Sequence, residues 1–232
     1  MLDNIKLSII IPCYNEKETI ERVINQLDEI NLNKEVILVD DGSIDGSREK
    51  LKNLQKKSKI RVLYHQRNLG KGAAIKTALN FISGDFVIIQ DADLEYSPAD
   101  YQKLLKCALE FHAQVVYGSR RSQSRHKRYS SFFFYLGGIF LTWLTNILYG
   151  TRITDVTTCY KLFKTELIKN IRLKSKRFEF CAEVTAKIAK KGIKIYEVPI
   201  HYFPRKPNEG KKIKWLDGFK LAWSLIKYRF ID

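Results

Sequence analysis

The sequence Phe-Val-Ile-Ile-Gln-Asp-Ala-Asp-Leu-Glu at residues 86–95 is an apolar run that ends directly on closely spaced carboxylates. Residues 86–89 are so uniformly apolar that we expect a strand buried on both faces. Two carboxylates one residue apart raise each other's proton affinity unless a cation lies between them. A hard divalent ion, which accepts carboxylate oxygens and leaves room for phosphate oxygens, relieves that repulsion. Asp91 and Asp93 therefore predict metal-assisted chemistry on a nucleoside diphosphate, with a solvated turn as the alternative.

The same alternation of apolar run and polar loop extends on both sides of this stretch. Predicted strands cover residues 6–11, 36–39, 60–64, 86–89 and 114–117, and predicted helices cover 16–30, 45–57, 72–82 and 98–111. Strands and helices that alternate with short connections form right-handed β-α-β units. The fold class we expect is therefore α/β, with a mostly parallel central sheet and helices on both faces.

Three polar clusters each follow one of these predicted strands directly. They are Pro12–Glu16, Asp40–Ser43 and Asp91–Asp93. In open parallel sheets, ligands bind in the crevice beyond the carboxyl ends of the strands. We therefore expect the three clusters to meet at one edge of the sheet and to form a ligand site.

The charge balance indicates an anionic partner. Lys and Arg number 41 against 25 Asp and Glu, a formal net charge of +16. Such an excess favours nucleic acid, an anionic bilayer surface or a phosphorylated substrate, with ordinary solubility as the alternative. Nucleic acid is disfavoured, because the basic residues flank apolar runs and do not form a stripe with stacking aromatic residues.

The cysteines and histidines suggest neither a disulfide framework nor a zinc site. The four cysteines, at positions 13, 107, 159 and 181, show no paired spacing, and the four histidines lie far apart. With no secretory signal at the first residues, we expect reduced thiols in a cytosolic protein.

Residues 132–149 form an uncharged, aromatic-rich segment that barely reaches the length of a membrane-spanning helix. Gly137 and Gly138 interrupt it, and its aromatic residues are spread along its whole length. A spanning helix, a helix in the bilayer interface and a buried core helix are all open interpretations.

The C-terminal residues 213–232 have aromatic and aliphatic side chains every three or four positions, surrounded by lysines. This pattern predicts a basic amphipathic helix at a lipid headgroup layer, with a helix docked on the sheet as the alternative. We therefore expect one domain over residues 1–212, which includes a membrane-interface segment at 129–150, followed by the helix at 213–232.

Taken in order, these motifs resemble family 2 glycosyltransferases, and more narrowly the dolichyl- or polyprenyl-phosphate mannosyl- and glucosyltransferases. The matching segments are residues 9–16, 39–47, 68–74, 90–95, 117–120, 154–161, 177–187, 197–200 and 209–215. The resemblance implies a GT-A fold, a Rossmann-like fold that binds nucleotide sugars. It also implies an inverting transfer of a hexose from GDP-mannose or UDP-glucose to a polyprenyl or dolichyl phosphate, at the cytoplasmic face of the membrane.

The resemblance also implies which residues bind the base and ribose of the donor. Pro12, Tyr14 and Glu16 match the segment that lines these groups. Asp40 matches an acid that hydrogen-bonds the base. Lys71 is a further candidate, a cation near the donor that could equally face solvent.

A second implied group binds the diphosphate of the donor. Asp91 and Asp93 match acids associated with Mg²⁺ or Mn²⁺, and Asp91 also lies near the ribose and diphosphate in the family. Glu95 stands where relatives often carry Gln as a further metal contact. Arg205 resembles an arginine that clamps the diphosphate from a mobile loop, and its planar fork suits phosphate.

The acceptor side is implied less completely. Arg120 matches a Gly-Ser-Arg element that we expect to hold the acceptor phosphate, and Arg128 and Ser131 are added by position. Asp155 is expected near the transferred sugar, with a structural cap as the alternative. No general base is assigned, because a polyprenyl phosphate is already ionised at neutral pH.

Two questions of partner remain open in the sequence. A surface glycan or a lipid-linked saccharide is an alternative acceptor for the same donor site. A separate membrane protein is an additional possible partner, because no multi-helix membrane segment follows residue 232.

Overall fold

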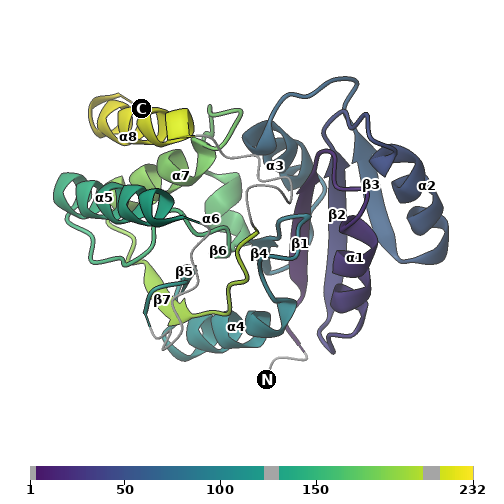
Figure 1. Ribbon diagram of the computed structural model, residues 1–232. Coiled ribbons are helices and arrows are strands. Elements are labelled where there is room, and N and C mark those ends of the chain that lie inside the picture. The colour runs from purple at the N-terminus through teal and green to yellow at the C-terminus, as the bar shows by residue number, and fades with distance from the viewer. Residues whose placement is uncertain (1–3, 123–130, 206–214, 232) are drawn as a thin grey trace.

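A seven-stranded sheet runs through the molecule in the order β3-β2-β1-β4-β6-β5-β7 (Figure 1). The computed structural model describes residues 4–122, 131–205 and 215–231. The strands are β1 Leu7–Cys13, β2 Lys34–Asp40, β3 Ile60–Tyr64, β4 Phe86–Ile89, β5 Val115–Ser119, β6 Lys161–Lys164 and β7 Tyr196–Pro199. All five strands expected from the sequence are present, and β3 and β4 have the predicted bounds.

Neighbouring strands are parallel except where β6 is involved. β6 runs antiparallel to both β4 and β5, whereas β1, β2, β3 and β4 are parallel, as are β5 and β7. The predicted α/β class with a mostly parallel sheet is therefore confirmed. The antiparallel strand was not predicted, because it is short and has a lysine at each end. Lys161 is nevertheless buried, since its Nζ donates to the carbonyls of Val156 (2.9 Å) and Thr158 (2.6 Å).

The four helices predicted between residues 16 and 111 are present and each is shorter than predicted, whereas the helices at 165–169 and 180–190 were not predicted. The helices are α1 Ile20–Asp28, α2 Ser47–Lys57, α3 Lys71–Leu79, α4 Tyr101–Glu110, α5 Phe132–Tyr149, α6 Thr165–Lys169, α7 Phe180–Lys190 and α8 Trp215–Phe230, with a 3₁₀ turn η1 at Pro98–Asp100. The first helix begins at Ile20 and not at Glu16, because the loop before it is fixed by contacts elsewhere. The Glu16 N–H donates to Ser47 Oγ (2.8 Å), and Thr19 Oγ1 donates to the Ala92 carbonyl (2.9 Å).

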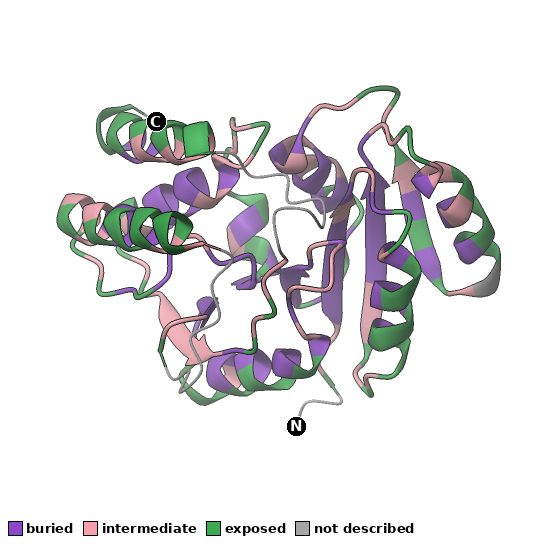
Figure 2. Ribbon diagram, viewed as in Figure 1, coloured by how far each residue is buried: buried purple, intermediate pink, exposed green. Residues whose placement is uncertain are grey.

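The central strands are buried on both faces. Every residue of β4 and five consecutive residues of β1 are buried, so neither face of the sheet meets solvent there (Figure 2). α3 packs on β1 and β2, α2 packs on β3, and α4 packs on β5 and β7. This explains why the strands have continuous apolar runs instead of alternating ones.

Helices α5, α7 and α8 pack together beside the sheet (Figure 1), and α7 also contributes Phe180, Val184 and Ile188 to the main core. α8 packs against both α5 and α7, and a small second core joins them, made of Leu141, Ile153, Val156, Ala182 and Leu225. The segment at 132–149 is therefore one helix with the predicted bounds. The predicted boundary at residue 212 lies outside the described residues.

A guanidinium holds α5 in place at a glycine. Arg121 donates to the Gly138 carbonyl (3.1 Å), to Thr142 Oγ1 (3.1 Å) and to the Thr154 carbonyl (3.0 Å). A Cβ at Gly138 would lie 2.3 Å from Nη2 of Arg121, so the glycine provides the space for this contact. Gly138 is thus a packing site and does not interrupt the helix.

Candidate active site

The three polar clusters meet at the carboxyl edge of the sheet, as predicted. The Asn15 N–H donates to Ser43 Oγ (3.0 Å), and the Ile44 N–H donates to Asn15 Oδ1 (2.9 Å), so the loops after β1 and β2 are joined. The bond from Thr19 to the Ala92 carbonyl joins the loop after β1 to the one after β4. Asn15 has φ +50°, a left-handed conformation that asparagine tolerates better than most residues.

Asp91 is paired with a lysine from the start of α3. Lys71 Nζ donates to Asp91 Oδ1 and also contacts Cys159 Sγ (3.3 Å). Burial opposes the charge on both groups, but each is stabilised by the other. The pKa of Lys71 is therefore raised well above its usual value, and the pKa of Asp91 is lowered. Lys71 thus points into the site and not into solvent.

Arg205 connects acids from two of these loops. Its guanidinium donates to Glu16 Oε1 (2.8 Å) and lies 2.8 Å from Asp93 Oδ2. The Glu16 carboxylate also accepts from Thr19 Oγ1 (2.6 Å). Glu16 and Asp93, predicted from separate motifs, therefore share one cation.

The segment that carries Arg205 lies across the loop after β4. The backbone N–H groups of Phe203 and Arg205 donate to the carbonyl (2.8 Å) and the carboxylate (2.7 Å) of Glu95. Tyr202 pairs with Tyr96 in an antiparallel bridge, and its hydroxyl donates to Glu95 Oε2 (3.1 Å). Glu95, which was predicted to contact a metal ion, here holds residues 202–205 in place through these hydrogen bonds. Most of the predicted mobile loop lies outside the described residues.

Asp93 carries charge that its single guanidinium does not balance. Burial raises the pKa of Asp93, and the nearby charges of Asp91 and Glu95 raise it further, to about 7, although Arg205 opposes them. Oxygen donors with excess negative charge suit a hard divalent cation, so Asp91, Asp93 and Glu95 fit Mg²⁺ or Mn²⁺ by chemistry. Among residues 4–122, 131–205 and 215–231, no group of three His, Cys, Asp or Glu is placed to hold a metal ion. A metal ion at these acids would compete with Lys71 for Asp91 and with Arg205 for Asp93.

A buried glutamine supports the loop that carries the acids. Gln90, the last residue before Asp91, accepts hydrogen bonds at Oε1 from the hydroxyls of Tyr101 and Tyr160 (2.7 Å from Tyr160). Its Nε2 donates to the Asp91 carbonyl (3.0 Å). The sequence showed Gln90 within a motif, but nothing in it linked that residue to tyrosines on two distant segments.

The paired acids after β2 have different partners. Asp40 is fully buried, and its carboxylate accepts from Arg48 Nε (2.7 Å). Asp41, which lies in a predicted cluster but had no role assigned to it, accepts from the backbone N–H groups of Leu69 (2.9 Å) and Gly70 (2.7 Å) and contacts His65 Nδ1 (2.7 Å). Asp41 thus fixes the loop that leads to Lys71. The contact of Asp40 with a base stays a prediction, as do the roles of the half-buried Pro12 and Tyr14.

Arg120 and Asp155 form a bidentate pair. Arg120 Nε and Nη2 donate to the two oxygens of Asp155 at 2.7 and 2.8 Å, and Nη2 also donates to Thr157 Oγ1 (2.7 Å). Asp155 is fully buried, which raises its pKa, but Arg120 lowers it below the usual value overall. The guanidinium also lies over the Tyr202 ring, 5.0 Å from its centroid. Asp155 thus orients the Arg120 guanidinium, and its place near the transferred sugar stays a prediction.

Ser131, a further predicted acceptor residue, lies at the start of α5. Ser131 is half-buried and immediately precedes α5, where its carbonyl accepts from the Tyr135 N–H (3.2 Å). Arg128 lies outside the described residues. All four cysteines are free, as predicted.

An exposed apolar surface lies on α5 and α8. Eight large hydrophobic side chains of α5 and six of α8 are exposed, and both helices are largely green in Figure 2. α5 is long and apolar enough to cross a membrane by length and composition alone. The buried-core interpretation of residues 132–149 is wrong, because only Gly138, Leu141, Thr142 and Thr145 of this helix are buried. The alternative of α8 docked on the sheet is also not favoured, because α8 packs on α5 and α7.

This sheet, with its acids and cations at one edge, is the architecture of a GT-A glycosyltransferase. Glucosyl-3-phosphoglycerate synthase from Mycobacterium tuberculosis, solved with Mg²⁺ and UDP, superimposes with a TM-score of 0.73 at 18% identity, over 99% of this chain and 81% of that one. A complex of the same enzyme with Mn²⁺, UDP and phosphoglyceric acid gives 0.69 at 17% identity, over 99% and 80%.

The family is shown by the sequence comparison. The model for glycosyl transferase family 2 matches residues 8–172, well over half of the chain, and the chain belongs to that family. A UDP-N-acetylglucosamine–dolichyl-phosphate N-acetylglucosaminyltransferase of Methanococcus voltae is 28% identical over 236 residues, which are 94% of each protein. The protein is therefore a glycosyltransferase, as the sequence motifs implied.

Proposed function

We propose that this glycosyltransferase moves a sugar from a nucleoside diphosphate to a polyprenyl or dolichyl phosphate, with inversion, at the cytoplasmic membrane surface. The observation that carries the proposal is the contact of Arg205 with both Glu16 and Asp93. It brings a phosphate-binding side chain and the predicted metal-binding acids to one point at the carboxyl edge of the sheet. Such an edge is where sheets of this class bind nucleotides.

On the donor side, Lys71 and Arg205 are the cations that would hold the diphosphate. Both now contact carboxylates, at Asp91 and at Asp93, so they lie within reach of the place where phosphate oxygens would sit. Asp91, Asp93 and Glu95 would hold Mg²⁺ or Mn²⁺, in keeping with the ions in the solved relatives. When bound, the ion neutralises charge that grows on the leaving diphosphate.

On the acceptor side, Arg120 is the side chain best placed to hold a lipid phosphate. Its pairing with Asp155 leaves it oriented, and its side chain is still 20% exposed. A phosphate dianion or monoanion needs no deprotonation, so orientation by a guanidinium is the main requirement. The dolichyl phosphate in the name of the Methanococcus voltae relative supports this class of acceptor. Arg128 and Ser131 stay predictions.

The exposed face of α5 and α8 would bring the enzyme to its acceptor. Aromatic side chains suit the headgroup layer, and on α8 they are mixed with lysines, so we propose that both helices lie in the bilayer interface. A separate membrane protein is a further proposed partner, and nucleic acid is not.

The test is a donor panel with the purified full chain. Labelled GDP-mannose, UDP-glucose and UDP-N-acetylglucosamine are each incubated with a polyprenyl phosphate and Mg²⁺ or Mn²⁺. We expect one donor to give a chloroform-extractable product that mild acid cleaves, and chelation to abolish it.

The acceptor role of Arg120 is tested by Arg120→Lys, which keeps the positive charge but loses the bidentate pair with Asp155. We expect it to raise the KM for the lipid by about tenfold and to leave the KM for the donor unchanged. Label that enters only a glycan, or no transfer from any donor, contradicts the proposed acceptor.

A further inference from the structure

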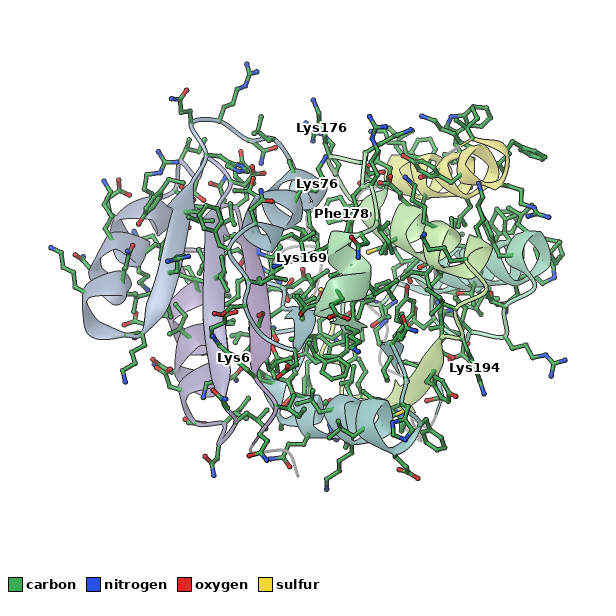
Figure 3. The ribbon with its side chains drawn as sticks, turned by 180° about the vertical axis from the view of Figure 1, so that it is seen from behind. Lys6, Lys76, Lys169, Lys176, Phe178 and Lys194 are labelled. Carbon is green, nitrogen blue, oxygen red and sulfur yellow. The ribbon has the colours of Figure 1, made fainter. Side chains whose placement is uncertain are left out.

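A hollow of about 370 Å³ lies between α8 and the loop before α7, away from the acids of the active site. Five basic side chains line it, with Glu179 as the carboxylate among its lining residues in the described chain: Lys174, Lys176, Arg177, Lys220 and Lys227. Figure 3 labels Lys176 at the outer edge of the molecule, between α3 and α8. Cations gathered at this density repel one another, and an anion bound among them would relieve that repulsion.

One wall of the hollow is fixed by a buried acid. Glu183 of α7 is fully buried and accepts from the backbone N–H groups of Lys174 and Ser175, both at 2.7 Å. Lys187 neutralises it at 3.1 Å. The wall is also attached to the active site, since the Lys176 carbonyl accepts from the Ala73 N–H (2.9 Å) in the first turn of α3.

The opposite wall is α8, which is anchored by its own buried face. Ser224 and Tyr228 line the hollow and are 5% and 4% exposed. Lys220 and Lys227 lie two turns apart on the same side of this helix and are exposed. The hollow is therefore formed by two packed elements, and Lys220 also lies 3.9 Å from Asp217 of its own helix.

The apolar neighbours of the hollow decide what kind of anion fits. Trp223 lines it and is 65% exposed, and Phe219 and Ile226 beside it on α8 are also exposed. A soluble phosphate gains nothing from exposed aromatic rings. A lipid headgroup does, because tryptophan and lysine occur together at the level of the headgroups.

We propose that this hollow binds the phosphate headgroup of an anionic bilayer lipid other than the acceptor, and that it fixes how the enzyme lies on the membrane. The proposal rests on the membrane association in the proposed function but not on the reaction. Lys176, Lys220 and Lys227 contact the phosphate, and Trp223 lies beside the glycerol and upper acyl chain.

The experiment measures binding to vesicles that contain no acceptor. Vesicles of phosphatidylcholine alone are compared with vesicles that also contain phosphatidylglycerol. The test variant is Lys220→Ala/Lys227→Ala. The control is Arg152→Ala/Arg229→Ala, which removes two exposed charges outside the hollow, one just after α5 and one near the end of α8. We expect the lysine pair to bind the anionic vesicles at least about tenfold more weakly than the control, and both to bind neutral vesicles equally.

Equal losses in the two double variants overturn the proposal, because they indicate diffuse attraction to the surface. Inorganic phosphate is also added to the parent protein with anionic vesicles. If a low concentration of phosphate weakens vesicle binding as much as the lysine double variant does, the proposal is overturned in favour of a soluble ligand. A raised KM for polyprenyl phosphate in neutral detergent, with vesicle binding intact, overturns it in favour of the acceptor. If no donor is transferred at all, the proposed function fails, yet vesicle binding still decides this site.

Discussion

The sheet and the group of α5, α7 and α8 differ in how many of their apolar side chains are buried within the protein. In the sheet, β1, β2 and β4 consist largely of fully buried residues, and the polar groups at its edge are paired with one another. The helical group has a small core, while α5 and α8 carry fourteen of the twenty exposed large hydrophobic side chains in the described residues. The sheet buries its apolar side chains within the protein, whereas α5 and α8 leave many of theirs exposed, and large exposed apolar surfaces mark protein or membrane interaction sites.

The largest effect is expected at the sheet edge, from Asp93→Asn. The amide keeps the size of the side chain but removes the charge that faces Arg205, so the fold should survive. We expect sugar transfer to fall by about 10³-fold, as for loss of a group that stabilises a leaving anion. Transfer is measured at saturating donor, with thermal unfolding as the check on folding. A variant as active as the parent would remove Asp93 from the proposed site.

The next effect tests the apolar helices, by Trp143→Ser/Trp223→Ser. Both rings are more than half exposed, so stability in water should change by less than about 0.5 kcal/mol. Binding to neutral vesicles should weaken by about 100-fold, since each ring forfeits on the order of 1–2 kcal/mol of burial. Co-sedimentation and thermal unfolding give the two values. A large loss of stability with unchanged vesicle binding would show that the rings pack within the protein.

A smaller effect is expected where the two regions are joined, at Gly138. Gly138→Ala should lower the free energy of unfolding by about 1–2 kcal/mol, because its Cβ displaces Arg121 from three hydrogen bonds. Gly137 is the matched control, since a Cβ there has nothing within 4 Å. Gly137→Ala should stabilise by about 0.5–1 kcal/mol through helix propensity. Urea unfolding measures both, and equal responses would refute the anchoring role of Arg121.

The smallest effect is the acid sensitivity of the sheet, at Glu35. Burial raises its pKa, but hydrogen bonds from Ser8, Ser83 and Lys6 lower it to about 2, from 4.5. A depressed pKa means that the stabilisation is complete above pH 4.5 and is lost as the pH falls toward 2. We expect on the order of 1–2 kcal/mol to be lost over that window, after allowance for partial exposure.

The control for this prediction is Glu35→Gln, which should lower stability at pH 7 and flatten its dependence between pH 4.5 and 2. Urea unfolding at a series of pH values gives both curves. Parallel curves for the parent and the variant would assign the acid sensitivity to other carboxylates.

The elements that the sequence predicted are those with a local signal. The strands at residues 60–64 and 86–89 are largely apolar and the helix at 132–149 is uncharged, and the bounds of all three were predicted correctly. The meeting of three loops at one edge followed from parallel topology alone. β6 carried no such signal, because the burial of Lys161 depends on carbonyls that only the folded chain presents.

The partners of the site residues were beyond prediction for a related reason. Arg48 pairs with Asp40 and Tyr160 with Gln90, and nothing in the local pattern favours these pairs over others. The sequence identified which groups carry charge at the site. Which of them contact one another depends on how segments far apart in the chain fold together.

Arg120 and Arg121 are consecutive, yet they hold different parts of the molecule. The first is clamped to Asp155 beside the reaction centre, and the second is tied to Gly138 in the exposed helix α5. Two neighbouring residues thus form a rigid spacer between the site and the helix. If α5 lies in a bilayer as proposed, this dipeptide would hold the proposed acceptor site at a fixed height above the lipid, and the acceptor phosphate would have to reach the enzyme at that level.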